Sequence, residues 1–262
     1  MIRRIPFAGA LNFRDIGGYP AGHGGRTRWG AVYRSDSLSF LTPEDLPAFD
    51  ALGIKAIYDL RRSREIALHP GPREHVHIEL PNRNPLDDGE PAALVTRRDG
   101  ERWLLADYRG MLASAGATFG ELFSRLAEPG RLPAVIHCLG GKDRTGLTVA
   151  LLLTALGVPR EVVLDDYQLT NGYRGVAHSS DVVALFVESG MARPAAEGLL
   201  GAPRRVLAQA LGELDETYTG IEGYLLGPGG MRPATLAALR TALLSWNPQV
   251  PDSADPKTGE TP

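Results

Sequence analysis

The stretch from Ala134 to Thr154 constrains the fold of this chain more than any other part of its sequence. It begins with a short, mainly apolar run of the length of a buried strand, and residues 145–156 have the composition of a buried helix. A tight loop rich in glycine separates the two. A strand, a loop and a helix in that order predict an α/β protein with a central, mainly parallel sheet flanked by helices.

The loop holds the only cysteine of the chain, Cys138, and Arg144 follows it six residues later. Gly140, Gly141 and Gly146 let the backbone curl, so that successive N–H groups can face an anion at the start of the next helix. A thiol beside a helix N-terminus and a guanidinium ionises readily, because both stabilise the negative charge. We therefore expect Cys138 to be a thiolate at neutral pH.

The residues around this thiolate suit a phosphate group. Arg144 offers a planar fork that can hold two phosphate oxygens. Thr145 can donate a hydrogen bond to the thiolate, which helps the sulfur to leave in the second half of a reaction. We predict that phosphate is bound by Leu139, Gly140, Gly141, Lys142, Arg144, Thr145 and Gly146.

An alternative interpretation makes Cys138 an inert core cysteine and residues 142–144 an exposed charged turn, because free cysteines are commonly buried. The coincidence of a strand, Cys-x5-Arg-Thr-Gly and a helix argues against it. A nucleotide-binding P-loop also fits poorly, because Lys142 is followed by Asp143 and not by Ser or Thr. A Rossmann fingerprint is absent from the sequence.

At residues 137–146 the sequence resembles the cysteine-dependent tyrosine phosphatase superfamily, whose signature is His-Cys-x5-Arg-Ser/Thr. More narrowly, it resembles the branch typified by the mycobacterial protein tyrosine phosphatase B. Three further stretches support that branch, namely residues 12–18, 33–36 and 59–61. The resemblance extends from about residue 10 to residue 245.

This resemblance implies hydrolysis of phosphate monoesters through a phosphocysteine intermediate, with no cofactor and no metal. Cys138 would attack phosphorus while Arg144 and the loop hold the oxygens, and an acid would protonate the departing oxygen. Two aspartates compete for that role, Asp143 in the loop and Asp59 at the end of a predicted strand. We favour Asp143, because the resembling branch keeps Asp there and because two nearby arginines can hold Asp59 in a structural ion pair.

Lys142 places a second cation in the loop, which the resembling phosphoinositide phosphatases share. The expected substrates are therefore phosphorylated proteins, through phosphotyrosine and phosphoserine or phosphothreonine, and phosphoinositides. In the alternative interpretation, Lys142 only pairs with a surface carboxylate. Two other functions are alternatives for the whole chain: a sulfurtransferase or arsenate reductase, and a catalytically silent phosphate-binding module. Reductases relay disulfides through further cysteines, which this chain lacks.

Length and composition limit the class of protein further. The chain has 262 residues, of which 43% are hydrophobic, and no linker interrupts it, so one domain over residues 1–247 is expected. A net charge of −3 with scattered basic residues predicts no binding to nucleic acid. A single cysteine excludes an internal disulfide. Without a signal peptide or a transmembrane segment in the sequence, we expect a cytoplasmic protein, with secretion by another route left open and the oligomeric state not predicted.

Residues before the loop are expected to form the other strands of the sheet. The predicted strands are residues 29–33, 54–59 and 74–80, and a helix is predicted to begin at Thr42 and end at Gly53. Arg14 and Asp15 are expected to form an ion pair that braces a turn. His75 and His77 share one face of a strand, but no third metal ligand is evident near them.

The remaining segments are predicted as a polar loop and helices. The loop covers residues 82–100, and the predicted helices are 102–113, 117–127, 159–170, 178–190, 194–200, 204–218 and 231–246. The helix 159–170 should end at Asn171-Gly172 and carry Asp165 and Asp166 on its polar side. The resembling branch has a helical lid, for which residues 178–200 are the candidate. Residues 248–262 are expected to be a disordered tail.

Overall fold

The computed structural model describes residues 2–87, 89 and 91–246. Five strands of this described chain form a central sheet in the order β1-β3-β6-β4-β5. Their bounds are β1 Arg14–Asp15, β3 Val32–Ser35, β4 Ala56–Asp59, β5 Val76–His77 and β6 Ala134–His137. The last four run parallel, and β1 pairs antiparallel with β3 at one edge. The prediction of an α/β protein with a mainly parallel sheet is confirmed.

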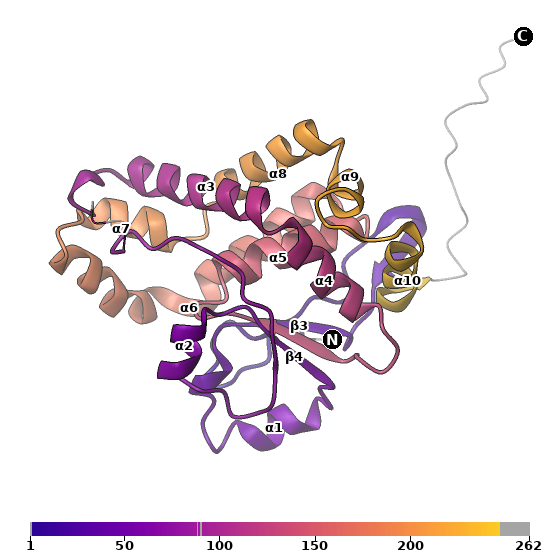
Figure 1. Ribbon diagram of the computed structural model, residues 1–262. Coiled ribbons are helices and arrows are strands. Elements are labelled where there is room, and N and C mark those ends of the chain that lie inside the picture. Colours follow the sequence, from indigo (N-terminus) through magenta and orange to yellow (C-terminus); the bar gives the residue numbers. More distant parts are fainter. Residues whose placement is uncertain (1, 88, 90, 247–262) are drawn as a thin grey trace, which may run out of the picture.

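Two more strands, β2 Gly25–Thr27 and β7 Leu244–Trp246, pair antiparallel outside this sheet. The α-helices are α1 Leu46–Ala51, α2 Ser63–Leu68, α3 Arg97–Ser114, α4 Gly116–Leu126, α5 Asp143–Ala155, α6 Arg160–Glu188, α7 Arg193–Leu200, α8 Arg204–Tyr218, α9 Ile221–Leu226 and α10 Pro233–Leu243. Short 3-10 turns lie at Gly22–Gly24, Leu38–Phe40 and Pro91–Ala93. Figure 1 shows α1 on one side of the strands, α3, α5 and α8 on the other, and α2 near one end of the strands.

Both faces of the sheet are covered, as a parallel sheet requires. Tyr58 and Ile136 point into the larger core, which the long helices complete. Ile57 and Val135, the alternate residues of the same strands, point to the opposite face. There they pack with a smaller cluster of aromatic rings, Phe7, Phe13, Tyr33 and Phe49. The strand before the loop is therefore fixed from both sides.

The strand register brings three strand ends together. Ser35, the last residue of β3, and Asp59, the last residue of β4, both pair with His137 at the end of β6. Ligands of open α/β sheets bind beyond such carboxyl ends, where loops and helix N-termini meet. The loop that follows β6 thus lies at the middle of the sheet, between two strands that end level with it.

The prediction that a helix ends at Asn171-Gly172 is wrong. α6 runs without interruption from Arg160 to Glu188 and includes most of the helix expected at 178–190. The side chain of Asn171 does not cap it, because it bonds to the backbone of Ala202, accepting from its amide at 2.8 Å and donating to its carbonyl at 3.1 Å. The helix therefore continues through Asn171-Gly172, because the contact with Ala202, 31 residues away, engages the side chain that was expected to end it.

The predicted start of the helix 102–113 and the predicted end of the helix 231–246 are also wrong. α3 begins at Arg97, inside the expected loop, because Thr96 and Asp99 form a capping box in which each accepts a bond from the backbone amide of the other, at 3.2 and 2.7 Å. The expected helix 231–246 is α10 followed by β7, because its last residues pair with β2. α9 was not predicted.

Other element boundaries differ by a few residues. β3 begins three residues later and ends two residues later than the predicted strand 29–33, and only Val76 and His77 of the predicted strand 74–80 belong to β5. α1 begins at Leu46, although Thr42 and Asp45 form the expected reciprocal bonds.

The expected tail at 248–262 lies outside the described residues. None of the helices in the described chain is both long enough and apolar enough to cross a bilayer.

Candidate active site

Cys138 is buried at the end of β6, at the centre of the sheet. Two backbone hydrogen bonds hold the chain on either side of it. The amide of Leu60 donates to the carbonyl of His137 at 2.8 Å, and the amide of Ser37 donates to the carbonyl of Leu139 at 3.0 Å. The sulfur-bearing residue is therefore fixed by the loops that follow both neighbouring strands.

Gly141 shapes the loop. Its φ is +61°, and a Cβ there would lie 2.5 Å from the amide nitrogen of Asp36, so only glycine fits. Its carbonyl accepts hydrogen bonds from Arg34 at 2.9 Å and from Asn12 at 3.0 Å. Because the N–H of a trans peptide points opposite to its C=O, the amide of Lys142 faces away from these two side chains. The curled loop that the glycines predicted is present.

Arg144 is the second residue of α5 and is almost fully buried. Its Nη1 and Nη2 donate to the two carboxylate oxygens of Glu65 at 2.6 and 3.0 Å, and Nη1 also donates to the carbonyl of Leu60 at 3.3 Å. Burial lowers the pKa of Arg144, but the charges of Cys138 and Glu65 outweigh it and raise the pKa overall. The guanidinium therefore stays charged and fixed in orientation.

One edge of the Arg144 guanidinium is left without a partner. The group has five N–H donors, and its Nε–H and one Nη2–H bond to no acceptor among the described residues. Adjacent donors of this kind bind two oxygens of one phosphate. The hydroxyl of Thr145 is also buried and has no hydrogen-bond partner in the described part of the chain, so the expected bond to the sulfur is not formed here. Both residues keep donors for an incoming oxyanion.

Lys142 and Asp143 face the long helices. The ammonium of Lys142 is buried, pairs with Asp143 and donates to the carbonyl of Leu199 at 3.0 Å. Asp143 is 29% exposed and accepts a bond from the hydroxyl of Tyr108 at 3.0 Å, and that hydroxyl lies 2.8 Å from the hydroxyl of Tyr167. The carboxylate therefore has a fixed orientation and still reaches solvent.

Asp59 lies in a different environment. It is fully buried, and the guanidinium of Arg61 holds it with bonds of 2.7 and 3.0 Å. Burial raises the pKa of Asp59, but Arg61 and the nearby His137 lower it more, so the net shift is downward. Arg62, the second of the two nearby arginines that the sequence offered as partners, lies 3.3 Å from Asp87 instead. Arg61 therefore fixes the carboxylate of Asp59, which also lies 3.7 Å from the imidazole of His137.

A second buried ion-pair cluster lies under the loop. Asp166 of α6 accepts from Arg14 at 3.1 Å, from Arg34 at 2.6 Å and from the hydroxyl of Tyr19 at 2.9 Å. Burial raises the pKa of Asp166, and the two arginines lower it well below its usual range. The prediction of a polar helix face is therefore wrong for Asp166, although Asp165 is exposed as expected.

The expected ion pair between Arg14 and Asp15 is not formed, because Arg14 is bound to Asp166. Asp15 nevertheless braces the turn, by accepting bonds from the backbone amides of Gly17 at 2.6 Å and Gly30 at 2.7 Å. Residues of the stretches 12–18 and 33–36 thus support the loop together, since Asn12 and Arg34 both donate to the carbonyl of Gly141.

The two strand histidines do not gather metal ligands. His77 lies 2.8 Å from the carbonyl of Arg61, and His75 lies 3.9 Å from a carboxylate oxygen of Asp59. Among residues 2–87, 89 and 91–246, no group of three or more His, Cys, Asp or Glu side chains is placed to hold a metal ion.

A cysteine and an arginine six residues apart, in a glycine loop at the carboxyl end of a parallel strand, are the features of a cysteine-dependent phosphatase. Residues 5–245 match the tyrosine phosphatase family, and the chain belongs to it. It is 31% identical to the triple specificity protein phosphatase PtpB of Mycobacterium tuberculosis, over 93% of this chain and 99% of the relative. It is 30% identical to a tyrosine-protein phosphatase of Nostoc commune, over 76% of this chain and 69% of the relative. The protein is a phosphatase, as the sequence predicted.

Three residues that bond to the site or to the arginines beneath it were not assigned to it from the sequence. Glu65 follows a run of basic residues, and nothing local shows that it binds Arg144, which is 79 positions away. Tyr108 occupies an apolar position of a helix, and only its bond to Asp143 shows its place in the site. Asp166 has the sequence pattern of an exposed helix face. Each was hidden because its partner lies far along the chain.

Proposed function

We propose that this protein hydrolyses phosphotyrosine and related phosphate monoesters through a phosphocysteine intermediate on Cys138. The observation that carries the proposal is the free edge of Arg144, which lies in the same loop as the buried cysteine. A thiolate cannot displace an oxygen from a dianionic phosphate unless positive charge and N–H donors hold the other oxygens. Arg144, the loop amides and the Thr145 hydroxyl supply these donors.

The reaction has two displacements at phosphorus. In the first, the Cys138 sulfur forms a bond to phosphorus while the bond to the ester oxygen breaks, and Asp143 gives its proton to that oxygen. In the second, water attacks phosphorus, the sulfur leaves as thiolate, and Asp143 takes the proton of the water. Asp143 suits this role better than Asp59, because it reaches solvent while Asp59 is enclosed and bound by Arg61.

We extend the proposal to more than one class of substrate. The Mycobacterium tuberculosis relative is named a triple specificity phosphatase. By analogy we propose activity on phosphoserine or phosphothreonine and on phosphoinositides as well as on phosphotyrosine. A nucleophilic thiol must stay reduced, so we propose the reducing cytoplasm as the working compartment.

We also propose that residues 178–200 cover the site. α7 packs against α3, and the carbonyl of Leu199 accepts a bond from Lys142 of the loop. Val183 and Phe186, on the preceding part of α6, are buried against the same core. A cover of this kind would protect an oxidisable thiolate that has no second cysteine to form a disulfide with.

Turnover of p-nitrophenyl phosphate tests the proposal. We expect activity that a metal chelator leaves unchanged, and no steady turnover by the Cys138→Ser variant, which should still bind phosphate esters because the cradle is intact. Steady turnover by that variant would refute the phosphocysteine mechanism. Binding without turnover by the natural protein would instead identify a silent phosphate-binding module.

A further inference from the structure

A cavity of about 410 Å³ lies between α6 and α7, directly beside the phosphate loop. Thr170 in its wall lies 3.4 Å from the side-chain amide of Asn12, which also donates to the carbonyl of Gly141. The guanidinium of Arg174, another wall residue, lies 3.2 Å from the position that a Cβ of Gly140 would occupy. The cavity and the loop that would hold the scissile phosphate therefore share a wall.

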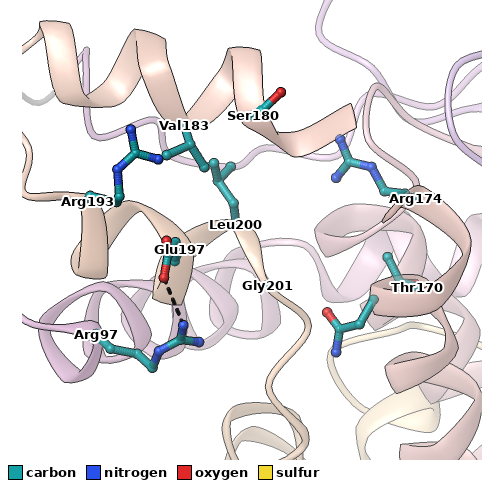
Figure 2. Close-up of a pocket in the computed structure, with 10 residues that line it drawn as sticks. Arg97, Thr170, Arg174, Ser180, Val183, Arg193, Glu197, Leu200 and Gly201 are labelled. Atoms are coloured by element: carbon teal, nitrogen blue, oxygen red, sulfur yellow. Dashed lines mark hydrogen bonds and ion pairs between the residues drawn. The ribbon is translucent and has the colours of Figure 1, made fainter. Parts of the chain in front are cut away.

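The cavity carries an excess of positive charge. Three arginines and one acidic residue, Glu197, contribute to its lining, and Glu197 is already paired with Arg97 at 3.0 Å. Figure 2 shows this pair on one wall, with Arg174 and Arg193 at opposite ends of the cavity. Across the described residues, neither Arg174 nor Arg193 forms a salt bridge. Two cations therefore face the cavity without a carboxylate partner.

Arg174 also has unmet hydrogen-bonding capacity. Its Nε is buried and has no hydrogen-bond partner in the described chain. Burial raises the pKa of Asp36 and the charge of Arg174 lowers it, but no salt bridge joins the two in the described chain, and Asp36 is bound instead by the amides of Leu11 and Asn12 at 3.2 and 3.1 Å. The buried Nε of Arg34 also has no partner in the described chain, but Arg34 is bound to Asp166, whereas Arg174 has no bonded carboxylate there. A cation beside the loop that no carboxylate neutralises can be satisfied by an anionic ligand.

Lys142, the cation that the sequence proposed for substrate selection, does not have this freedom. Its ammonium is 3% exposed and is bound by Asp143 and by the carbonyl of Leu199. Arg174 lies against the same loop and its charge is not neutralised by a bonded carboxylate. The cation placed to meet a second negative group near the scissile phosphate is therefore Arg174.

We propose that Arg174 forms a second anion-binding subsite, which binds a phosphate carried on the same small ring as the scissile phosphate. The inference rests on the proposed phosphatase function and names a substrate class for it, a bisphosphorylated polyol headgroup. A second phosphate on one ring is held close to the first by covalent geometry, which suits a guanidinium that contacts the loop itself. A second phosphorylated residue of a peptide is held farther away and on a flexible chain. Val183 and Leu200, between the two arginines, offer apolar contact to the rest of the substrate.

The test compares a short-chain phosphatidylinositol bisphosphate that has adjacent phosphates with the matching monophosphate. We expect the natural protein to prefer the bisphosphate and Arg174→Gln to lose about tenfold more kcat/KM on the bisphosphate than on the monophosphate, since one charged hydrogen bond is removed. Arg174→Lys, which keeps the charge, should lose less. Arg232→Gln is the matched control, because it removes one positive charge just before α10, a helix that does not line the cavity and lies on the other side of the molecule from α7 in Figure 1, and it should leave the preference unchanged.

Titration of the Cys138→Ser variant with the same two compounds makes the result independent of turnover. If the natural protein hydrolyses neither compound, nor p-nitrophenyl phosphate, the proposed function fails, and the titration still decides the subsite. Equal losses on both compounds in Arg174→Gln, or equal binding of both by Cys138→Ser, would overturn the inference. A preference seen only with doubly phosphorylated peptides would overturn it as well, because it would assign the cavity to a peptide.

Discussion

Aspartate and arginine side chains lie on both sides of the phosphate loop, but they differ in burial and in ion pairing. We call the side of the loop next to β1, β3 and β4 the strand side. There Arg14 and Arg34 bind Asp166 of α6, and Arg61 binds Asp59, all with side chains that are at most 1% exposed. On the helix side, Asp143 is 29% exposed, and the Nε of Arg174 is without a partner in the described chain. The Nε of Arg34 also has no partner in the described chain, but Arg34 is bound to Asp166 and to the carbonyl of Gly141. A buried charge that is bonded to an opposite charge supports the loop, whereas a charge without a bonded counter-charge can meet a substrate.

The physical reason lies in desolvation. A buried ion pair contributes little net stability, but removing one partner leaves an unpaired charge in a medium of low dielectric, which is costly. The strand side therefore cannot rearrange when a ligand binds. On the helix side Asp143 is partly exposed and Arg174 has a free donor, so these groups can exchange partners during a reaction. Four predictions follow from this difference, given in order of the size of the expected effect.

Removing the proposed acid should have the largest effect. Asp143→Asn should lower kcat by about 10²–10⁴-fold on an aryl phosphate with a poor leaving group, because the departing oxygen then leaves unprotonated. The loss on p-nitrophenyl phosphate should be much smaller, since p-nitrophenolate needs little assistance. The basic limb of the pH profile should disappear as well.

Asp59→Asn is the comparison on the strand side. It removes the partner of Arg61 and should lower the free energy of unfolding. Any loss of activity should be equal on both esters. If Asp59→Asn alone showed the dependence on the leaving group, the assignment of Asp143 as the acid would be wrong.

Asp166→Asn should destabilise the protein by about 3–5 kcal/mol, because it leaves Arg14 and Arg34 buried without a counter-charge. The adjacent Asp165→Asn is the matched control. Asp165 is 67% exposed and pairs with Arg204 at the surface, so its loss should cost less than about 1 kcal/mol. Denaturant unfolding of the two variants measures the difference, and similar midpoints would contradict the structural role of Asp166.

The two sides should also respond to acid with opposite signs. Burial lowers the pKa of His137 on the strand side to about 4, so the unfolded chain binds more protons below about 6.5, and stability is lost as the pH falls from there towards 4. Burial raises the pKa of Asp107, which lies near Asp143 and Lys142, to about 6. The folded chain therefore binds more protons between about 3.9 and 6, and this contribution to stability is lost as the pH rises.

Each of these contributions is on the order of 3 kcal/mol. His137→Gln should remove the loss of stability in acid, and Asp107→Asn should remove the opposing term, so that their pH profiles diverge between pH 4 and 6.5. Unfolding by urea across that range measures both slopes. Profiles parallel to that of the natural protein would show that neither group titrates as described.

The smallest effect concerns the proposed cover. Asn171→Ala removes the two bonds that join α6 to Ala202 just after α7, and should speed inactivation by peroxide about two- to tenfold. Gln209→Ala, which removes an exposed bond to Glu213 on α8, serves as the control. Equal inactivation rates for the two variants would count against a cover over Cys138.

Local patterns predicted the elements that depend on neighbouring residues. β6 and α8 have the predicted bounds, and the glycine loop contains the Gly141 turn that its composition indicated. Errors occurred where a distant contact decides the outcome. α6 continues through Asn171-Gly172 because Ala202 engages the side chain of Asn171, and β7 exists because β2 offers it a partner.

The sequence by itself determined the contiguous part of the site. Cys138, Arg144 and the glycines between and after them lie within one strand-loop-helix unit, so their spacing and the curl of the backbone are set by local geometry. That unit was enough to predict the sheet, the loop and the enzyme class.

Only the tertiary structure decided which charges around the loop are bound and which are free. Arg144 finds Glu65 over 79 positions, and Arg14 finds Asp166 over 152 positions. The order of the strands and the packing of α6 on them bring these partners together, and no local pattern encodes that order. The sequence could indicate the ion pair of Asp59 because its partner, Arg61, is only two residues away. The burial of Lys142 and the unpaired charge of Arg174 depend on contacts distant in sequence, so they became visible only in the folded chain.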